Sequence, residues 1–293
     1  MAAADVTTDA MTYGTLAPGR FGRTILALTS RLPDNWLGLR LAIALRRAVT
    51  LRLDYPDGAL DVERWGLRLR LHPRDNGCEK NLLFTPQMYE PAELRELAVE
   101  IARVKEQQQR PFVFADIGAN VGLFSLFVAS RAGPDARILA IEPEAGNLRR
   151  LRFNVDANPG VPIKVIPTAL SDEDGELAIE LHPRDRGGNR TTKLVGSKSS
   201  DPAMRVPSQT LLQLLKQERL GAIDALKIDV EGFEDIILCP FFRDAAPAIW
   251  PCLIIIEDGR GSWGTDLISL MMSKSYAIAA RTKLNIILRR MPA

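Results

Sequence analysis

The feature that most constrains the fold is a regular alternation of apolar, strand-like runs with helix-like segments from residue 112 onward. Such runs lie at residues 112–118, 136–144, 161–172, 175–183, 223–234 and 252–258. Strands separated by helices are typical of a parallel sheet covered by helices on both faces. The sequence therefore predicts an α/β fold with a Rossmann-like, doubly wound and mostly parallel sheet. Residues 275–290 predict a closing hairpin.

Four of the strand-like runs end in an acidic residue. These residues are Asp116, Glu142, Asp229 and Glu257. In open α/β sheets, ligands bind beyond the carboxyl ends of the parallel strands. We therefore expect the functional site at that edge, with these acids around it.

The 293 residues predict three regions. Residues 1–20 are expected to be a disordered tail, residues 21–109 a helical and β extension, and residues 110–293 the main domain. Within the extension, the pattern indicates one or two amphipathic helices broken near Pro33, a half-buried strand at 67–71 and a helix at 91–110. Residues 183–205 are rich in Gly, Ser and basic residues, so they are expected to form a long loop, either a lid or disordered.

Charge is distributed unevenly along the chain. The formal net charge is only +2, which argues against an extended nucleic-acid face. Residues 20–52 nevertheless hold seven arginines and a single acid, Asp34. We expect these helices to cover one end of the domain with their arginines in solvent; peripheral contact with a membrane or a partner is the alternative.

The three cysteines, Cys78, Cys239 and Cys252, are widely spaced and form no CxxC or Cys/His pattern. They predict neither disulfides nor a structural zinc site. Because the sequence shows neither a membrane-spanning run nor a signal-peptide pattern at residues 1–20, we expect a cytoplasmic protein.

A glycine turn follows the first strand of the main domain, in the order Asp116, Gly118, Asn120, Gly122. A dinucleotide turn requires G-x-G-x-x-G, and Asn120 occupies the place of its middle glycine. The turn therefore favours a smaller zwitterionic group over a pyrophosphate, and Asp116 could pair with an ammonium group. Glu142, twenty residues after Gly122, could accept both hydrogen bonds of a ribose diol. S-adenosylmethionine fits this combination better than NAD.

Five segments resemble, in order and spacing, the motifs of FkbM-like S-adenosylmethionine-dependent methyltransferases. They read FADIGANVGLFSLFVA, AIEPEAGNLRRLRFNV, TALSDEDGELAI, LKIDVEGFEDIIL and LIIIED. The resemblance covers about residues 110–290 and implies a class I methyltransferase sheet with an antiparallel last strand. It also implies methyl transfer, typically to oxygen on a sugar or secondary metabolite. One departure is Leu212, where family members often carry an acid.

The resemblance assigns cofactor-binding residues by position. Asp116, Gly118, Asn120 and Gly122 would line the methionine part, Glu142 would hold the ribose, and Ser171 and Asp172 would lie near the adenine. We count their neighbours Ala119 and Pro143 with this set.

The acceptor side is predicted around the end of the strand at 223–234. Asp229 would orient the acceptor or accept its proton. Lys227 could steady that carboxylate or act as a base, and Glu231 and Glu257 are further candidate carboxylates. We expect Gly232 to let the turn bend Glu231 away from the strand.

Other groups carry weaker expectations. Three carboxylates could hold a divalent cation, but no histidine accompanies them, and we predict no metal. His72 and His182 are expected to be surface residues rather than bases. Asn189 could contact substrate, and its neighbours Arg184, Arg186 and Arg190 would suit an acidic acceptor.

The leading hypothesis is an S-adenosylmethionine-dependent O-methyltransferase that acts on a small-molecule or glycan hydroxyl. An NAD-dependent oxidoreductase and a non-catalytic S-adenosylmethionine-binding module are the alternatives. A nucleic-acid methyltransferase is disfavoured, because the chain reads DVEG where amino-group methylation uses a D/N-P-P-Y turn.

Overall fold

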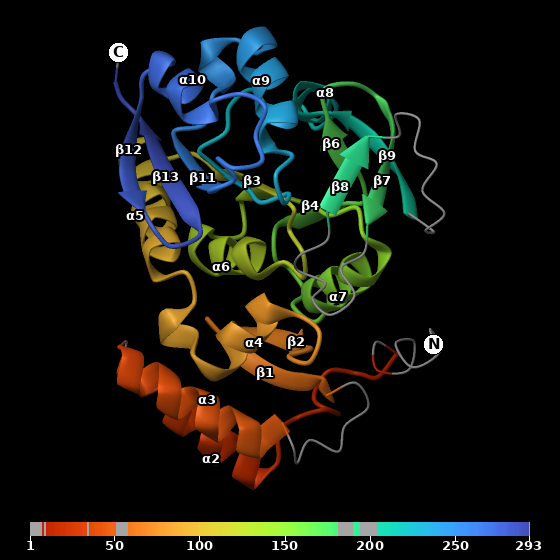
Figure 1. Ribbon diagram of the computed structural model, residues 1–293, viewed down its shortest axis with the longest axis vertical. Helices are drawn as coiled ribbons and strands as arrows, with labels where there is room; N and C mark the ends of the chain where they lie inside the picture. Colours follow the sequence, from red (N-terminus) through yellow and green to blue (C-terminus); the bar gives the residue numbers. More distant parts are fainter. Residues whose placement is uncertain are drawn as a thin grey trace. The chain divides into compact units, whose positions relative to one another are not determined.

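The computed structural model describes Thr8 and residues 10–33, 35–50, 58–180, 190–193 and 204–292 (Figure 1). The chain divides into two compact units, each considered by itself. The first comprises Met1–Pro91, Arg152–Pro159 and Pro183–Gly187, and the second Ala92–Leu151, Gly160–His182 and Gly188–Ala293. None of the helices in the described ranges is both long and apolar enough to span a lipid bilayer.

The second unit is built on a seven-stranded sheet of order β12-β13-β11-β10-β3-β4-β5. Its strands are β3 (Val113–Ile117), β4 (Arg137–Ile141), β5 (Ile163–Ile166), β10 (Ala225–Ile228), β11 (Leu253–Glu257), β12 (Tyr276–Arg281) and β13 (Asn285–Arg290). All neighbours from β11 to β5 pair in parallel, whereas β13 is antiparallel to both β11 and β12. The predicted doubly wound, mostly parallel sheet with an antiparallel last strand and closing hairpin is confirmed.

Helices cover both faces of this sheet (Figure 1). They are α5 (Pro91–Gln107), α6 (Leu123–Ala132), α7 (Ala145–Asp156), α8 (Leu211–Gln217), α9 (Glu234–Asp244) and α10 (Leu267–Ser273), with a short 3-10 helix, η4 (Pro247–Ile249). Val113, Ala115 and Ile117 of β3 join one core with α8, α9 and α10. Successive strand residues point to opposite faces, so Asp116 faces the other way, where it contacts Ser125 of α6. This alternation places Asp116 beside the helix that follows the glycine turn.

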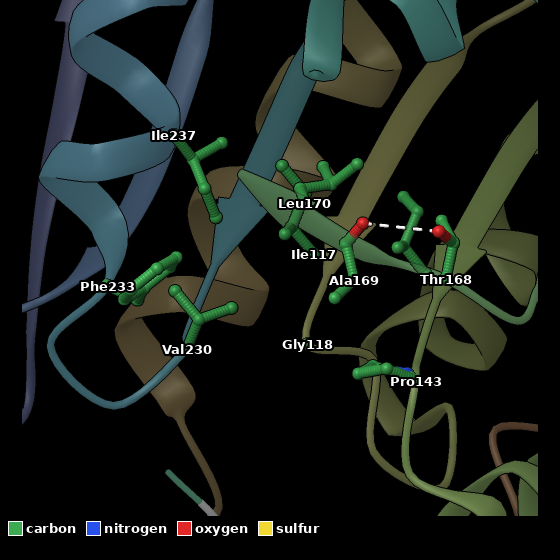
Figure 2. A pocket seen from close by; sticks show the side chains of 10 residues that line it. Ile117, Gly118, Pro143, Thr168, Ala169, Leu170, Val230, Phe233 and Ile237 are labelled. Atoms are coloured by element: carbon green, nitrogen blue, oxygen red, sulfur yellow. Dashed lines mark hydrogen bonds between the residues drawn. The ribbon is translucent and has the colours of Figure 1, made fainter. Parts of the chain in front are cut away.

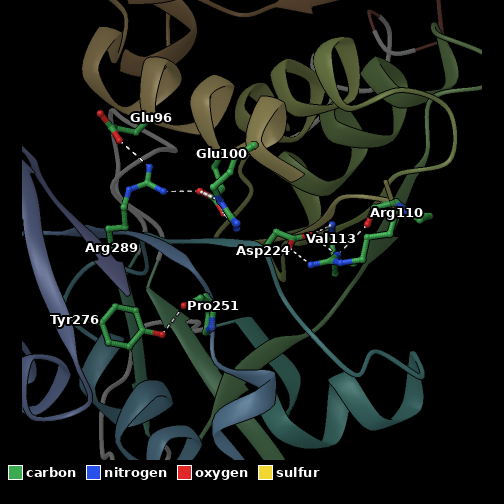
Figure 3. A network of polar contacts seen from close by, with 10 residues as sticks. Glu96, Glu100, Arg110, Val113, Asp224, Pro251, Tyr276 and Arg289 are labelled. Carbon is green, nitrogen blue, oxygen red and sulfur yellow. Dashed lines mark hydrogen bonds and ion pairs between the residues drawn. The ribbon is translucent and has the colours of Figure 1, made fainter. Parts of the chain in front are cut away.

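Ion pairs fasten the first helix and the loops of this unit to the sheet (Figure 3). Arg289 of β13 pairs with Glu100 of α5 and, at 3.0 Å, with Glu96. Asp224, fully buried just before β10, accepts bonds from the Arg110 guanidinium at 2.5 and 2.9 Å. Buried carboxylates of this kind need such partners, because an unpaired buried charge costs several kcal/mol.

A second, four-stranded sheet of order β6-β9-β7-β8 lies in the same unit. It comprises β6 (Ala169–Ser171), β7 (Gly175–Glu180), β8 (Arg190–Lys193) and β9 (Met204–Thr210). The single strand predicted at 161–172 is wrong: Pro167 interrupts it, and β5 and β6 belong to different sheets. The predicted loop at 183–205 is also partly wrong, because β8 and the start of β9 lie within it. Its other residues lie outside the described part.

The first unit contains helices α2 (Arg20–Thr29), α3 (Trp36–Thr50) and α4 (Gly77–Phe84), the 3-10 helix η2 (Pro86–Met88) and a hairpin of β1 (Leu60–Arg64) and β2 (Leu67–Leu71). The two amphipathic helices separated at Pro33 and the strand at 67–71 are confirmed. That strand is not half-buried, however, because Leu69, Arg70 and Leu71 are all buried.

Arg70 also explains why the disordered tail predicted for residues 1–20 is wrong over residues 10–20. The Arg70 side chain pairs with Asp61 at 2.7 Å and donates to the carbonyl oxygens of Met11 and Thr12. Leu16 is only 2% exposed, and its N–H donates to Asp61. A buried ion pair that needs backbone partners holds the segment in place.

Candidate active site

The predicted glycine turn connects β3 to α6 and lies against the end of β10. Gly118 has a φ of 75°, in the left-handed region that favours glycine. Its N–H and that of Ala119 donate to the carbonyl oxygen of Ile141, at 3.0 and 2.9 Å. A Cβ atom at Gly118 would lie 2.0 Å from the carbonyl oxygen of Asp229. Glycine is therefore required where the turn meets the strand that carries Asp229.

The second half of the turn also has left-handed backbone. Asn120 and Gly122 have φ angles of 52° and 85°. A Cβ at Gly122 would lie 2.4 Å from Cδ1 of Leu151. Gly118 is thus required by the backbone that packs against it, whereas Gly122 is favoured by its positive φ. Asn120 tolerates the left-handed conformation between them.

Asp116 is 1% exposed at the end of β3. Its Oδ2 accepts hydrogen bonds from the Ser125 N–H at 3.0 Å and the Ser125 hydroxyl at 2.6 Å. Its Oδ1 has no hydrogen-bond partner among the described residues. Burial raises the pKa of Asp116, while the charge of Lys227 and the bonds from Ser125 lower it. A buried acceptor without a partner is costly, so Oδ1 is suited to a donor from a ligand.

Glu142 follows β4 and is 5% exposed. One carboxyl oxygen accepts the Asn120 N–H and the other accepts the Glu144 N–H, both at 2.8 Å. Burial raises the pKa of Glu142 to about 8, although these two backbone bonds lower it. The glycine turn thus holds the carboxyl that the sequence assigns to the ribose.

An apolar pocket lies beside these groups (Figure 2). It is lined by Ile117, Gly118, Ile141, Pro143, Thr168, Ala169, Leu170, Val230, Phe233 and Ile237. Gly118 and Pro143 therefore line one cavity. Ser171 and Asp172 do not line it; the Ser171 hydroxyl instead lies 3.0 Å from the Asp172 carboxylate at the end of β6. The residues before them, Thr168 to Leu170, line the pocket instead.

Lys227 and Asp229 form an ion pair at the end of β10. Lys227 Nζ donates to Asp229 Oδ2 at 3.0 Å. The lysine side chain is 6% exposed and the aspartate side chain 36%. Nζ also lies 4.9 Å from the centre of the Phe124 ring, within cation–π range. Asp229 and the Phe124 ring thus both hold the Lys227 ammonium group. The Asp229 carboxylate itself is partly exposed to solvent.

Glu231 and Glu257 lie with Asp229 in one group, the carboxylate cluster. One carboxylate oxygen from each residue lies within 4.8 Å of the other two. Glu231 and Gly232 both have positive φ, 56° and 95°, so the turn bends as predicted, yet the Glu231 carboxylate is not carried away from the cluster. Burial raises the pKa of Glu257 to about 8, and the charges of Asp229 and Glu231 contribute to that rise.

Two acids that the sequence reasoning missed hold the loops of the site. Glu234 accepts hydrogen bonds from the N–H of Val230 at 2.9 Å and from the Trp263 indole at 2.7 Å. Asp235 accepts from the N–H of Gly264 at 2.7 Å. In a sequence, adjacent acids in the first turn of a helix normally suggest interaction with the helix dipole. Their hydrogen bonds to the loops become visible only in the folded structure.

The remaining candidates fall elsewhere. His72 is not a surface residue as expected: it is 1% exposed in the first unit, where its backbone N–H donates to Glu79 at 2.6 Å. His182, Asn189, Arg184 and Arg186 lie outside the described residues, as does the side chain of Arg190.

Residues 116–269 match the family described as Methyltransferase FkbM domain, just over half of the chain. AMB antimetabolite synthetase AmbE of Pseudomonas aeruginosa is 31% identical over 181 residues, which are 50% of this chain and 8% of AmbE. Methyltransferase sdnD of Sordaria araneosa is 33% identical over 151 residues, which are 42% of this chain and 58% of sdnD. The chain thus spans less than two thirds of either relative.

Two solved structures of methyltransferases resemble the chain over nearly its full length, at low similarity. The METTL16 MTase domain gives a TM-score of 0.48 at 14% identity and covers 95% of this chain and 98% of its own. A methyltransferase from Geobacter sulfurreducens gives 0.40 at 15% identity, covering 96% and 100%. The sequence match from Asp116 to residue 269 instead carries the assignment, since it includes the glycine turn, Glu142 and the carboxylate cluster. The chain belongs to the methyltransferase FkbM domain family, and this membership implies S-adenosyl-L-methionine as its cofactor.

Proposed function

We propose that this protein transfers the methyl group of S-adenosyl-L-methionine to a hydroxyl oxygen of a small-molecule or glycan acceptor. The observation that supports this most directly is the close approach of the glycine turn and the end of β10. Only a glycine at position 118 leaves room for the Asp229 backbone, and the Asp229 carboxylate is partly exposed. A donor-binding turn and an acceptor-binding carboxylate are therefore adjacent.

The residues present fit the cofactor. Asp116 has a buried, unpartnered Oδ1 that would accept a hydrogen bond from the ammonium group. Glu142 would accept the two ribose hydroxyls, because a carboxylate has lone pairs beyond those that its backbone bonds use. The apolar pocket around Pro143, Leu170 and Phe233 would take the adenine ring. When bound, the cofactor supplies an electrophilic methyl group on a sulfonium.

On the acceptor side, Asp229 orients the hydroxyl and takes its proton as the new carbon–oxygen bond forms. Lys227 holds Oδ2 of that carboxylate, which leaves Oδ1 for the acceptor. Glu257, with its pKa raised to about 8, is mostly protonated at neutral pH and can donate a hydrogen bond to a second oxygen of the acceptor. An acceptor with neighbouring hydroxyls, such as a sugar, suits these two groups.

The proposal is tested by incubating the protein with cofactor labelled with carbon-13 at the methyl group and a cell extract as the source of acceptors. We expect a labelled product whose carbon-13 chemical shift identifies a methyl group on oxygen. The control is Asp244→Asn, which alters an exposed pair with Arg243 on α9 and should leave the yield unchanged. Label on nitrogen would refute O-methylation. Tight cofactor binding without any product would favour the non-catalytic alternative.

A further inference from the structure

The helices α2 and α3 of the first unit concentrate large apolar side chains on their exposed surface. Ten large apolar side chains are exposed in the described residues, and six of them lie between positions 21 and 41. These six, the apolar face, are Phe21, Leu28, Trp36, Leu37, Leu39 and Leu41. Single exposed apolar residues are ordinary, but a contiguous group marks an interaction site.

The packing of α3 is the reverse of an ordinary surface helix. A surface helix normally turns its large apolar residues toward the core. Among the positions of α3 whose burial is described, Gly38 and Ala42 are buried, and Ile43 and Leu45 are partly buried. A Cβ at Gly38 would lie 2.0 Å from the carbonyl oxygen of Pro33, in the turn before the helix. Trp36, 69% exposed, and Leu37, 50% exposed, lie outside that contact. From Trp36 to Ala42, the helix therefore buries small residues and exposes large apolar ones.

The neighbouring helix α2 also exposes large apolar side chains. Figure 1 shows α2 and α3 side by side, and contacts between them confirm it. Ile25 and Leu26 are buried, whereas Phe21 and Leu28 are about half exposed, at 47% and 51%. Each helix thus buries some of its residues within the first unit and exposes others as part of the apolar face.

Basic residues accompany the apolar face in both helices. Arg20, Arg23, Arg31 and Arg40 are exposed, and neither helix contains an acid. The Arg40 guanidinium lies 5.5 Å from the centre of the Trp36 ring, so charge and aromatic surface are combined at one place. Since the whole chain has a formal net charge of only +2, the positive charge of residues 20–52 is offset by acids elsewhere.

We propose that the apolar face docks on an anionic lipid bilayer. Arginines interleaved with Trp, Phe and Leu are the pattern of helices that lie in the membrane interface: the apolar side chains enter the boundary region while the guanidinium groups bind lipid phosphates. A nucleic acid would pair with the arginines but would leave Leu37 and Leu41 in water. The bilayer satisfies both the charge and the exposed apolar surface, and this docking would bring acceptors at a membrane surface within reach of the protein.

The full chain is tested by sedimentation with phosphatidylcholine vesicles and with vesicles containing three parts phosphatidylcholine to one part phosphatidylglycerol. We expect binding to the anionic vesicles only, weakening as NaCl is raised. Trp36→Ser combined with Leu37→Ser, and separately Arg20→Gln combined with Arg40→Gln, should each lower the partition coefficient by at least about fivefold. The control is Val99→Ser combined with Met272→Ser, two exposed apolar residues outside the face, which should bind like the wild type.

Three results would overturn the proposal. The first is no binding to anionic vesicles, and the second is equal binding to neutral ones. The third is a concentration-dependent dimer in analytical ultracentrifugation that Trp36→Ser and Leu37→Ser together abolish, because the face would then be a contact between copies. Circular dichroism of each variant checks folding, which these exposed substitutions should not change, and cofactor binding by each variant separates this proposal from that of methyl transfer.

Discussion

Glu142 is expected to make the binding of an adenosine ligand depend on pH. In the free protein, burial raises the pKa of this carboxyl to about 8. A ribose diol brings two hydroxyl donors, and each needs an acceptor. The ionised carboxylate accepts both in addition to its bonds from Asn120 and Glu144, whereas the protonated carboxyl carries a hydrogen that itself needs an acceptor. Binding should therefore select the ionised form.

The magnitude follows from the pKa. One pH unit below it, at about pH 7, the protonated carboxyl outnumbers the carboxylate by about tenfold. Affinity should therefore rise about tenfold per pH unit up to about pH 8 and then level off. Each ligand bound at about pH 6 to 7 should release close to one proton.

Calorimetry with 5′-methylthioadenosine measures this directly, because the ligand carries the ribose and adenine but no amino group that would titrate in the same range. Titrations in phosphate and in Tris buffer give the number of protons released from the difference in apparent enthalpy. Glu142→Gln should remove both the release and the pH dependence, and should weaken binding by about 1–3 kcal/mol above about pH 8. Glu257→Gln is the matched control, because the pKa of Glu257 is also raised to about 8 but the residue lies in the carboxylate cluster.

The reasoning is refuted if binding releases no proton, or if Glu142→Gln retains the wild-type pH dependence. Loss of the release in Glu257→Gln alone would show that the nucleoside binds at the carboxylate cluster instead.

Three further predictions concern stability and metal dependence. Gly118→Ala should lower the free energy of unfolding by more than about 2 kcal/mol in urea titrations and should prevent cofactor binding, because the new Cβ would clash with the Asp229 backbone. The control is Gly160→Ala, which has a φ of 91° but open space around it and should lower the free energy of unfolding by only about 1–2 kcal/mol. Equal losses in the two variants would contradict the clash. Because the pKa values of Glu142 and Glu257 are raised, the folded protein binds more protons than the unfolded chain between the ordinary glutamate pKa of 4.5 and about 8. The free energy of unfolding should therefore fall as pH rises through that window, and should fall less in the double Gln variant. A stability that rises with pH there would count against these shifts. Methyl transfer should persist in EDTA, because Lys227 already neutralises Asp229; activity lost in EDTA and restored by Mg²⁺ would instead assign a cation to the carboxylate cluster.

The large sheet could be predicted from the sequence because its central strands are buried on both faces. Such strands read as short continuous apolar runs, and β3 and β10 are buried throughout. The small sheet could be predicted only in part, because β7 lies within the strand-like run at 175–183 but β9 does not read as a strand. Its strand β9 reads MRVPSQT, with Pro207 inside it, and a proline within a run normally argues against a strand.

The same contrast holds for the site. Asp116, Glu142 and Asp229 could be placed together because parallel strands end at one edge of the sheet. Ser125 contacts Asp116 from α6, and Glu234 is bonded by Trp263 of a loop that folds back on it. Local sequence specifies neither contact. Arg70 reads as the outward residue of an alternating strand, and only its ion pair with Asp61 shows why it is buried.

The central claim is that the methyl donor lies at the glycine turn and the acceptor at Asp229. The most direct test compares Asp229→Asn with the wild type in two measurements on the same samples. These are the Kd for S-adenosylhomocysteine by calorimetry and the rate of labelled methyl transfer. The account predicts an unchanged Kd and a loss of transfer of at least about a hundredfold. An Asp229→Asn protein that no longer binds S-adenosylhomocysteine, or that still transfers methyl groups at the wild-type rate, would contradict it.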